Sequence, residues 1–271
     1  MEILDTAAAL ELYDPRVWVA GDWHGNAAWV GSLFPAMRRH DAQMATVLQL
    51  GDYGFDHHER DTTHAVDYWA RRAGIQNVLV TLGNHEDWGT VSRAHAVSPG
   101  EAIRVSEVVW LLPRPFRLTI MGRSVLSLGG ASSVDRSWRT EGRDYWPDEL
   151  ITEQMERDAI DGGAVDILLT HEAPLNGTAE AAAVLATNPH GFPDDALAVS
   201  AAQRERIERV RRGTQPKIHF HGHIHVHGER TFEDGSRVFA LNRDTKPGHV
   251  GVLDMATLQF EPLAMSAIHR R

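Results

Sequence analysis

The 271-residue sequence contains no cysteine, which excludes disulfide bonds and zinc–thiolate sites. A chain without thiols is compatible with a reducing compartment, and we predict a cytoplasmic location. The acidic first 14 residues lack the basic and apolar segments of a secretory signal. No apolar run approaches membrane-spanning length, so we expect no membrane partner.

Positive charge is also scarce, and the net charge is −10 with histidine neutral. A surface that tracks nucleic-acid phosphates needs the opposite sign, so we expect no extended nucleic acid as partner. The same negative net charge disfavours a nuclease. The hydrophobic fraction of 42% suffices for one large core, and the chain has no repeat or clear linker. We therefore predict a single domain over residues 1–271.

Apolar runs that end in glycine and a polar residue recur along the chain. In the stretch 47–52, an apolar run predicts a buried strand, and Gly51 allows a sharp turn that leaves Asp52 at the strand's carboxyl end. Ligands bind at that edge of open α/β sheets. Four other runs end similarly. The polar residues after the five runs are Asp22, His24, Asp52, Asn84, His85, His171, His223 and His225.

We interpret these residues as a two-metal site in which Asp52 is shared by both ions. Carboxylate, amide and imidazole ligands without thiolate suit Mn²⁺, which we expect first, or Fe, Zn²⁺ or Ni²⁺. Two such ions about 3.5–4 Å apart clamp the attacking and leaving oxygens of a phosphoryl centre and acidify a bridging water. Our hypothesis is in-line attack by the resulting hydroxide on a phosphate ester.

The order of elements predicts an α/β fold. Strands at 16–20, 45–50 and 77–82 alternate with helices at 26–39 and 61–73, which favours a parallel sheet. The apolar stretches alone are compatible with two sheets face to face or with one large mixed sheet. The remaining expectations are a short helix within 6–13, antiparallel strands at 108–112, 116–121 and 124–128, a loop at 129–143, a helix at 148–160, strands at 165–169 and 217–221, an irregular segment at 174–195, a helix at 200–212, and a terminal antiparallel set at 228–232, 237–242, 249–253 and 258–262.

The five motifs resemble those of the calcineurin-like metallophosphoesterase family and occur in the family's order. They are Asp22-x-His24, Gly51-Asp52, Gly83-Asn84-His85-Glu86, Thr170-His171 and Gly222-His223-x-His225. The resemblance implies a four-layer α/β/β/α sandwich of two mixed sheets flanked by helices, with two metal ions. It implies that Asp22, His24 and His225 bind one metal, that Asn84, His171 and His223 bind the other, and that Asp52 bridges them. His85 resembles the family's catalytic histidine that binds no metal, and would protonate the leaving oxygen.

Departures from the family pattern narrow the expected activity. The protein phosphatase branch carries Gly-Asp-x-x-Asp-Arg-Gly, whereas here Asp56 is followed by His57. Gly-His-x-His is similar to the small phosphodiesterases and nucleotide phosphatases. We therefore predict a phosphodiesterase acting on a small phosphorylated substrate, possibly a nucleotide. The alternatives are a phosphomonoesterase, a dinucleoside polyphosphate hydrolase, or a non-catalytic scaffold of the same fold.

Other residues are candidates for supporting roles. Arg136, Arg139 and Arg143 suit phosphate binding, with Trp138 as a face for a base, but an ordinary surface loop is an equal interpretation. His221 is a candidate substrate-binding or supporting residue, and Glu86 is expected to hold a histidine. We expect Asp56, His57 and His58 to form a solvated loop in preference to a substrate-facing rim.

Overall fold

Strand β4 (Thr46–Gln49), which precedes Asp52, lies inside an eight-stranded sheet in the computed structural model, which describes residues 2–55 and 62–268. Its neighbours β3 (Arg16–Ala20) and β5 (Asn77–Val80) run parallel to it, so all three send their following loops to one edge. The order is β1-β6-β7-β5-β4-β3-β14-β15. The outer strands are β1 (Asp5–Ala7), β6 (Ala102–Arg104), β7 (Val109–Leu111), β14 (Val250–Asp254) and β15 (Phe260–Pro262).

The second sheet has seven strands in the order β12-β13-β11-β10-β9-β8-β2. Its four central strands, β13, β11, β10 and β9, are parallel to one another. The strands are β2 (Glu11–Leu12), β8 (Phe116–Ile120), β9 (Arg123–Leu128), β10 (Ile167–Thr170), β11 (Ile218–His221), β12 (Gly228–Thr231) and β13 (Arg237–Ala240).

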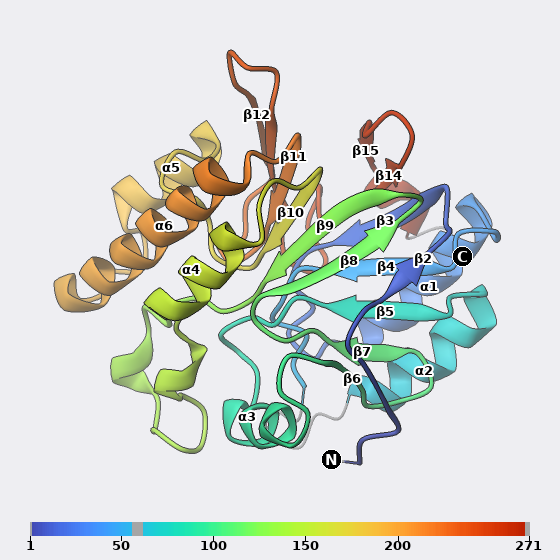
Figure 1. Cartoon of the computed structure of the whole chain (residues 1–271), viewed down its shortest axis with the longest axis horizontal. Helices are drawn as coiled ribbons and strands as arrows, with labels where there is room; N and C mark the ends of the chain where they lie inside the picture. The colour runs from blue at the N-terminus through green and yellow to red at the C-terminus, as the bar shows by residue number, and fades with distance from the viewer. Residues whose placement is uncertain (1, 56–61, 269–271) are drawn as a thin grey trace.

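Helices cover the outer faces of both sheets, with α1 and α2 on the first sheet and α4 and α6 on the second (Figure 1). The helices are α1 (Ala27–His40), α2 (Thr62–Ala73), α3 (Trp88–Val97), α4 (Glu153–Asp161), α5 (Ala179–Thr187), α6 (Asp194–Thr214) and α7 (Met265–Ile268), with 3₁₀ turns η1 (Arg136–Trp138) and η2 (Pro147–Glu149). No helix among the described residues combines the length and apolar character needed to cross a membrane.

Alternating side chains of each central strand fill two different cores. In β3, Val17 and Val19 face the second sheet, where they join Phe220 of β11, whereas Trp18 faces the helices. Both faces of the strand are therefore buried, which explains its continuous apolar sequence. The two mixed sheets flanked by helices confirm the predicted four-layer architecture.

Four local predictions are wrong. The strand expected at 108–112 does not join those at 116–121 and 124–128, because β7 lies in the first sheet and runs parallel to β5. The segment 6–13 forms no helix, because β1 pairs with β6 and β2 pairs with β8 as edge strands. The segment 174–195 is not irregular throughout, since its alanine-rich part forms α5, capped by Thr178. The final strands are not one antiparallel set. β13 runs parallel to β11 in the second sheet, and β14 and β15 belong to the first.

Helix boundaries agree with the sequence-based expectations only in part. Asn26 caps α1 as expected, accepting a hydrogen bond from Trp29 N at 3.0 Å. The helix expected at 148–160 begins at Glu153, after the short turn η2. The helix expected at 200–212 begins earlier, at Asp194, and α3 was not predicted.

Candidate metal centre

The eight polar residues that follow the apolar runs lie at one edge, where the carboxyl ends of parallel strands from both sheets meet. The loop after β3 supplies Asp22 and His24, and the loop after β4 supplies Asp52. The loops after β5, β10 and β11 supply Asn84, His85, His171, His223 and His225. The structure thus brings together residues up to 203 positions apart (22 to 225) in the chain.

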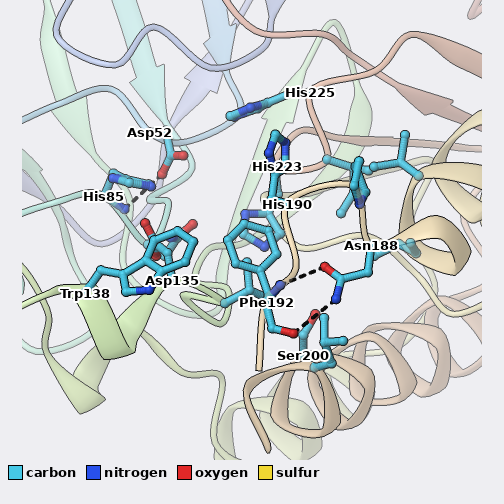
Figure 2. Close-up of a pocket in the computed structure, with 17 residues that line it drawn as sticks. Asp52, His85, Asp135, Trp138, Asn188, His190, Phe192, Ser200, His223 and His225 are labelled. Atoms are coloured by element: carbon cyan, nitrogen blue, oxygen red, sulfur yellow. Dashed lines mark hydrogen bonds between the residues drawn. The ribbon is translucent and has the colours of Figure 1, made fainter. Parts of the chain in front are cut away.

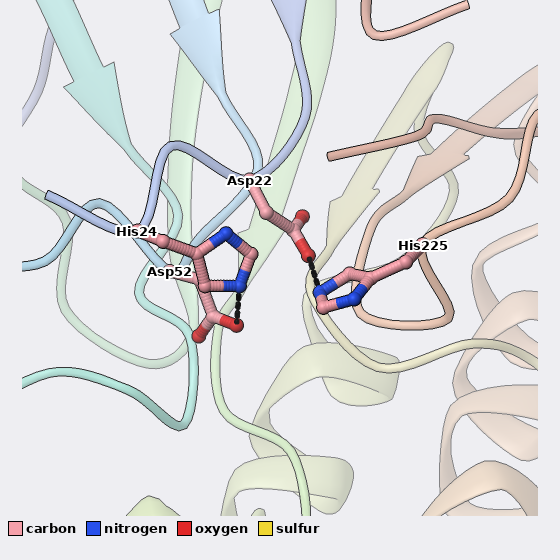
Figure 3. Close-up of side chains that lie close together, drawn as sticks. All are labelled: Asp22, His24, Asp52 and His225. Carbon is pink, nitrogen blue, oxygen red and sulfur yellow. Dashed lines mark ion pairs between the residues drawn. The ribbon is translucent and has the colours of Figure 1, made fainter. Parts of the chain in front are cut away.

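One cluster consists of Asp22, His24, Asp52 and His225 (Figure 3). One nitrogen or oxygen atom from each lies within 4.8 Å of those of the others. His24 Nε2 is 3.4 Å from Asp52 Oδ2, and His225 Nε2 is 3.1 Å from Asp22 Oδ2. This spacing suits a single cation between two carboxylates and two imidazoles.

A second cluster consists of Asp52, His171 and His223, so that Asp52 belongs to both. His171 Nε2 lies 3.2 Å from Asp52 Oδ1 and 3.1 Å from Asn84 Oδ1. The amide oxygen of Asn84 therefore faces the same space. Asp52 turns one carboxylate oxygen toward each cluster.

The backbone at the site is strained. His24, Asp52, His223 and His225 all have positive φ, between 47° and 67°, a region that residues with a side chain rarely adopt. Such strain concentrates at functional sites, because the surrounding structure must hold it in place. Gly222 shows how tight the packing is, since a Cβ there would lie 2.1 Å from Asp22 Oδ1.

The residues fit metal ions by their chemistry. The donors are imidazole, carboxylate and amide, which suit borderline divalent metals. Asp52 Oδ2 is buried and accepts no hydrogen bond from the residues that the structure describes. Burial alone lowers the pKa of His171, but the carboxylates of Asp52 and Asp22 raise it to about 10. The negative electrostatic potential from these two carboxylates therefore favours a positive charge at the site.

A family model described as calcineurin-like phosphoesterase matches residues 15–227, which is more than half of the chain. The chain belongs to the calcineurin-like phosphoesterase family. The members are hydrolases of phosphate esters that depend on two metals, so the chain is a metal-dependent phosphoesterase. No curated protein sequence matches it.

Solved structures similar to this chain share its fold. The protein TT1561 of Thermus thermophilus has a TM-score of 0.56 at 11% identity, covering 93% of this chain and 99% of that one. A dimetal phosphatase of Danio rerio has a TM-score of 0.55 at 14% identity, covering 92% and 96%. The sulfate thiohydrolase SoxB of Thermus thermophilus has a TM-score of 0.50 at 16% identity, covering 96% and 58%.

Two carboxylates around the phosphoesterase site make contacts that the motifs did not predict. Asp244, in the loop after β13, is 3.7 Å from His24 Nδ1 and also accepts a hydrogen bond from Asn26. Its contact with His24 turns Nε2 of that ring toward Asp52. Glu86 was expected to hold a histidine, but its carboxylate binds backbone N–H groups of the loop after β4. It accepts hydrogen bonds from the N–H groups of residues 53, 54 and 55 at 2.9–3.0 Å, which fixes the loop after Asp52.

A chain of hydrogen bonds orients Asn84. Its Nδ2 donates to Ser133 Oγ at 3.0 Å, and Ser133 Oγ donates to Glu149 Oε2 at 2.8 Å. Ser133 N also donates to Glu149 Oε1 at 2.6 Å. Because the amide nitrogen is held from behind, the amide oxygen is directed at the second cluster.

The predicted arginines are separated in the structure. Arg139 Nη2 lies 2.6 Å from His85 Nε2 and 2.7 Å from Asp135 Oδ2. Arg136 instead pairs with Asp195, and Arg143 is exposed. Burial and the Arg139 guanidinium lower the pKa of His85 to about 4, although Asp52 opposes them. His85 is therefore neutral in this arrangement.

His221 is buried at the end of β11, and its Nδ1 is 3.0 Å from Gly222 O. It does not line the cavity at the site. His219, in the same strand, is also buried, and its Nε2 lies 2.8 Å from Thr170 Oγ1. Asp56, His57 and His58 lie outside the described residues.

Glu149 makes stability depend on pH. Burial raises its pKa from the ordinary 4.5 to about 8, against the opposing Ser133 hydrogen bonds. The folded protein therefore keeps this proton while the unfolded chain releases it. The contribution of this proton to the free energy of unfolding is complete below pH 4.5 and is lost as pH rises through 8. Between pH 5.5 and 7.5, we expect the free energy of unfolding of the wild type to fall by about 2 kcal/mol more than that of Glu149→Gln.

Urea titrations in chelator at several pH values measure this difference. The exposed Glu233→Gln is the matched control and should follow the wild type. Equal pH slopes for the wild type and Glu149→Gln would contradict the prediction.

Proposed function

We propose that the chain is a two-metal phosphodiesterase that hydrolyses a small organic phosphate diester. The observation that carries this proposal is the position of Asp52 between the two clusters, with Oδ1 3.2 Å from His171 and Oδ2 3.4 Å from His24. A shared carboxylate holds two cations at the short separation that phosphoryl transfer uses. A cytoplasmic location remains a prediction.

The proposed ligands follow the clusters. Asp22, His24 and His225 hold one ion, Asn84, His171 and His223 hold the other, and Asp52 bridges them. Mn²⁺ is the first choice for both positions, since no thiolate is present. When bound, the two ions supply Lewis acidity and hydroxide near neutral pH.

The residues around the ligands place the substrate and move a proton. Asn84 keeps its oxygen on the metal side because Ser133 holds its nitrogen. A phosphate at the edge offers Arg139 a charged acceptor, which competes with the neutral ring of His85. Release of Arg139 from His85 also removes the nearby charge that lowers the pKa of that ring. We propose that the ring then takes up a proton from solvent and donates it to the leaving oxygen.

The charge of the cavity supports a diester over a monoester. Its described lining residues include no lysine or arginine, and Arg139, which can meet the phosphate, shares its positive charge with Asp135. A diester carries one negative charge near neutral pH, whereas a monoester carries up to two. The smaller charge requires less compensation from the protein than the larger one.

Removal of the shared carboxylate tests the metal centre. In Asp52→Asn, the negative charge between the two clusters is lost, so we expect metal content to fall and hydrolysis of a bis-aryl phosphodiester to drop by at least about 10²-fold. The protein is stripped with chelator and reloaded with Mn²⁺, and bound metal is measured by elemental analysis. Glu233→Gln serves as the control.

An aryl phosphomonoester is assayed beside the diester. Metal-dependent activity with monoester preference would contradict the diesterase assignment alone. Unchanged metal content and activity in Asp52→Asn would contradict the metal centre itself.

Gly222 tests whether the position of Asp22 matters to the metal. In Gly222→Ala, the added Cβ would lie 2.1 Å from Asp22 Oδ1, so the carboxylate must move. We expect metal affinity to fall by about 10–100-fold, the range typical of disturbed ligand orientation. Gly177→Ala is the control, because its Cβ meets no atom closer than 3.4 Å. Equal affinities for the two variants, measured by competition with a metal indicator, would contradict the role of Asp22.

Comparison of two substrates with different leaving groups tests whether His85 donates a proton. With an alkyl leaving group, which needs a proton, His85→Ala should lower kcat by roughly 10²–10⁴-fold. With a nitrophenyl leaving group, the same variant should be affected far less. An equal loss on both esters would assign His85 to another role, and no loss on the alkyl ester would exclude proton donation.

A further inference from the structure

The cavity at the metal edge extends into a second, apolar half. It has a volume of about 570 Å³, within the range of small-molecule sites. Asp52, His223 and His225 line the metal edge of the cavity, and its remaining lining includes Trp138, Phe192 and side chains of α5 and α6 (Figure 2). The apolar half is thus continuous with the proposed site of hydrolysis.

Two aromatic rings from separate segments meet at this wall. Trp138 belongs to η1, and Phe192 belongs to the connection between α5 and α6. Their ring centroids are 5.5 Å apart and their planes are inclined by 41°. Although Trp138 contacts Phe192, 66% of its surface remains exposed. Because both rings line the cavity, they offer apolar faces to a molecule that enters it.

The turn that presents Phe192 is already fixed in the absence of substrate. Asn188 adopts the left-handed conformation at the end of α5. Its Oδ1 accepts a hydrogen bond from Phe192 N at 2.9 Å, and its Nδ2 donates to Phe192 O at 3.0 Å. The polar amide in the wall is therefore used to hold the turn. A turn fixed in advance loses little entropy on binding.

The wall disfavours a second negative charge. The described lining residues include Asp135 and neither lysine nor arginine, so a second phosphate group would find little compensation there. Valine and leucine side chains from α5 and α6 also line the cavity and extend its apolar surface. A flat, uncharged ring matches both the aromatic faces and this lack of lysine and arginine in the described lining.

We propose that the apolar half of the cavity, bounded by Trp138 and Phe192, binds a flat, uncharged aromatic ring on the organic part of the phosphoester. This inference rests on the proposed function, because the phosphate is held at the metal edge. It names the class of substrate, namely a phosphoester that carries an aromatic ring and no second phosphate.

Matched phosphonates test the inference without hydrolysis. Phenylphosphonate and methylphosphonate share a head group and differ in the ring. We expect the Mn²⁺-loaded protein to bind the phenyl compound about tenfold more tightly, as measured by calorimetry. Trp138→Ala and Phe192→Ala should bring the ratio of the two dissociation constants close to one, with little change for methylphosphonate. Tyr13→Ala, which removes an exposed ring elsewhere, should leave the ratio unchanged.

A second pair distinguishes the source of the ring. It consists of a nucleoside 5′-phosphonate and the ribose 5-phosphonate that lacks the base. A ring effect in the first pair supports an aryl group close to phosphorus, and an effect in the second pair alone supports a nucleobase. Equal affinities within both pairs, or ratios that survive both aromatic substitutions, overturn the inference.

Hydrolysis separates this inference from the proposed function. Metal-dependent diester hydrolysis that is lost in Asp52→Asn, together with no ring effect, overturns the ring site alone. Absence of metal-dependent hydrolysis, together with a ring effect that needs Trp138 and Phe192, overturns the proposed function and leaves the ring site supported.

Discussion

The structure at the active edge depends on the placement of Asp52 between two neighbouring loops, those after β3 and β5. Its backbone oxygen accepts hydrogen bonds from Trp23 N and His24 N at 3.0 and 2.6 Å, which attaches the loop after β3. Its Oδ1 accepts from His85 N at 2.9 Å, which attaches the loop after β5. The residue has φ of 49°, and a Cβ on Gly83 would lie 2.2 Å from its nitrogen. Glu86 supports the same loop from the buried side, so the strain at Asp52 is held by contacts on every side.

Much of this edge could be predicted from the sequence because each part is local. An apolar run, a glycine and a polar residue together specify a buried strand and the side chain placed just beyond its end. Parallel strands then bring those ends together without further information. Glu86 shows the limit of such local patterns. Its place in the motif was identified correctly, but its partners are backbone N–H groups that no motif records.

Pairing between distant strands could not be predicted from the sequence. The final strands were predicted as an antiparallel set, and that error concealed Asp244. Since β13 runs parallel to β11, the loop after β13 reaches the metal edge and places Asp244 beside His24. The hydrogen-bonded series Glu149–Ser133–Asn84 could not be predicted for a related reason, because its members lie up to 65 positions apart (84 to 149) and only Asn84 belongs to the recurring motif. The edge strands β1 and β2 were missed for the same reason, because they pair with the distant strands β6 and β8.

The two ends of the cavity obey different physical constraints. At the metal edge, carboxylates and imidazoles face one another within 4.8 Å, so charge there must be balanced over a short distance. At the other end, Trp138 and Phe192 are held by η1 and by the turn after α5, neither of which contributes a strand to the sheets. The turn after α5 is held by Asn188, whereas Arg139, which follows η1, lies 2.6 Å from His85 and links that segment to the metal edge. Solved structures at 11% and 14% identity share the fold, which locates the edge and leaves the substrate undefined. Selectivity in this chain is therefore expected from η1 and the α5–α6 connection, and not from the sheets that build the metal centre.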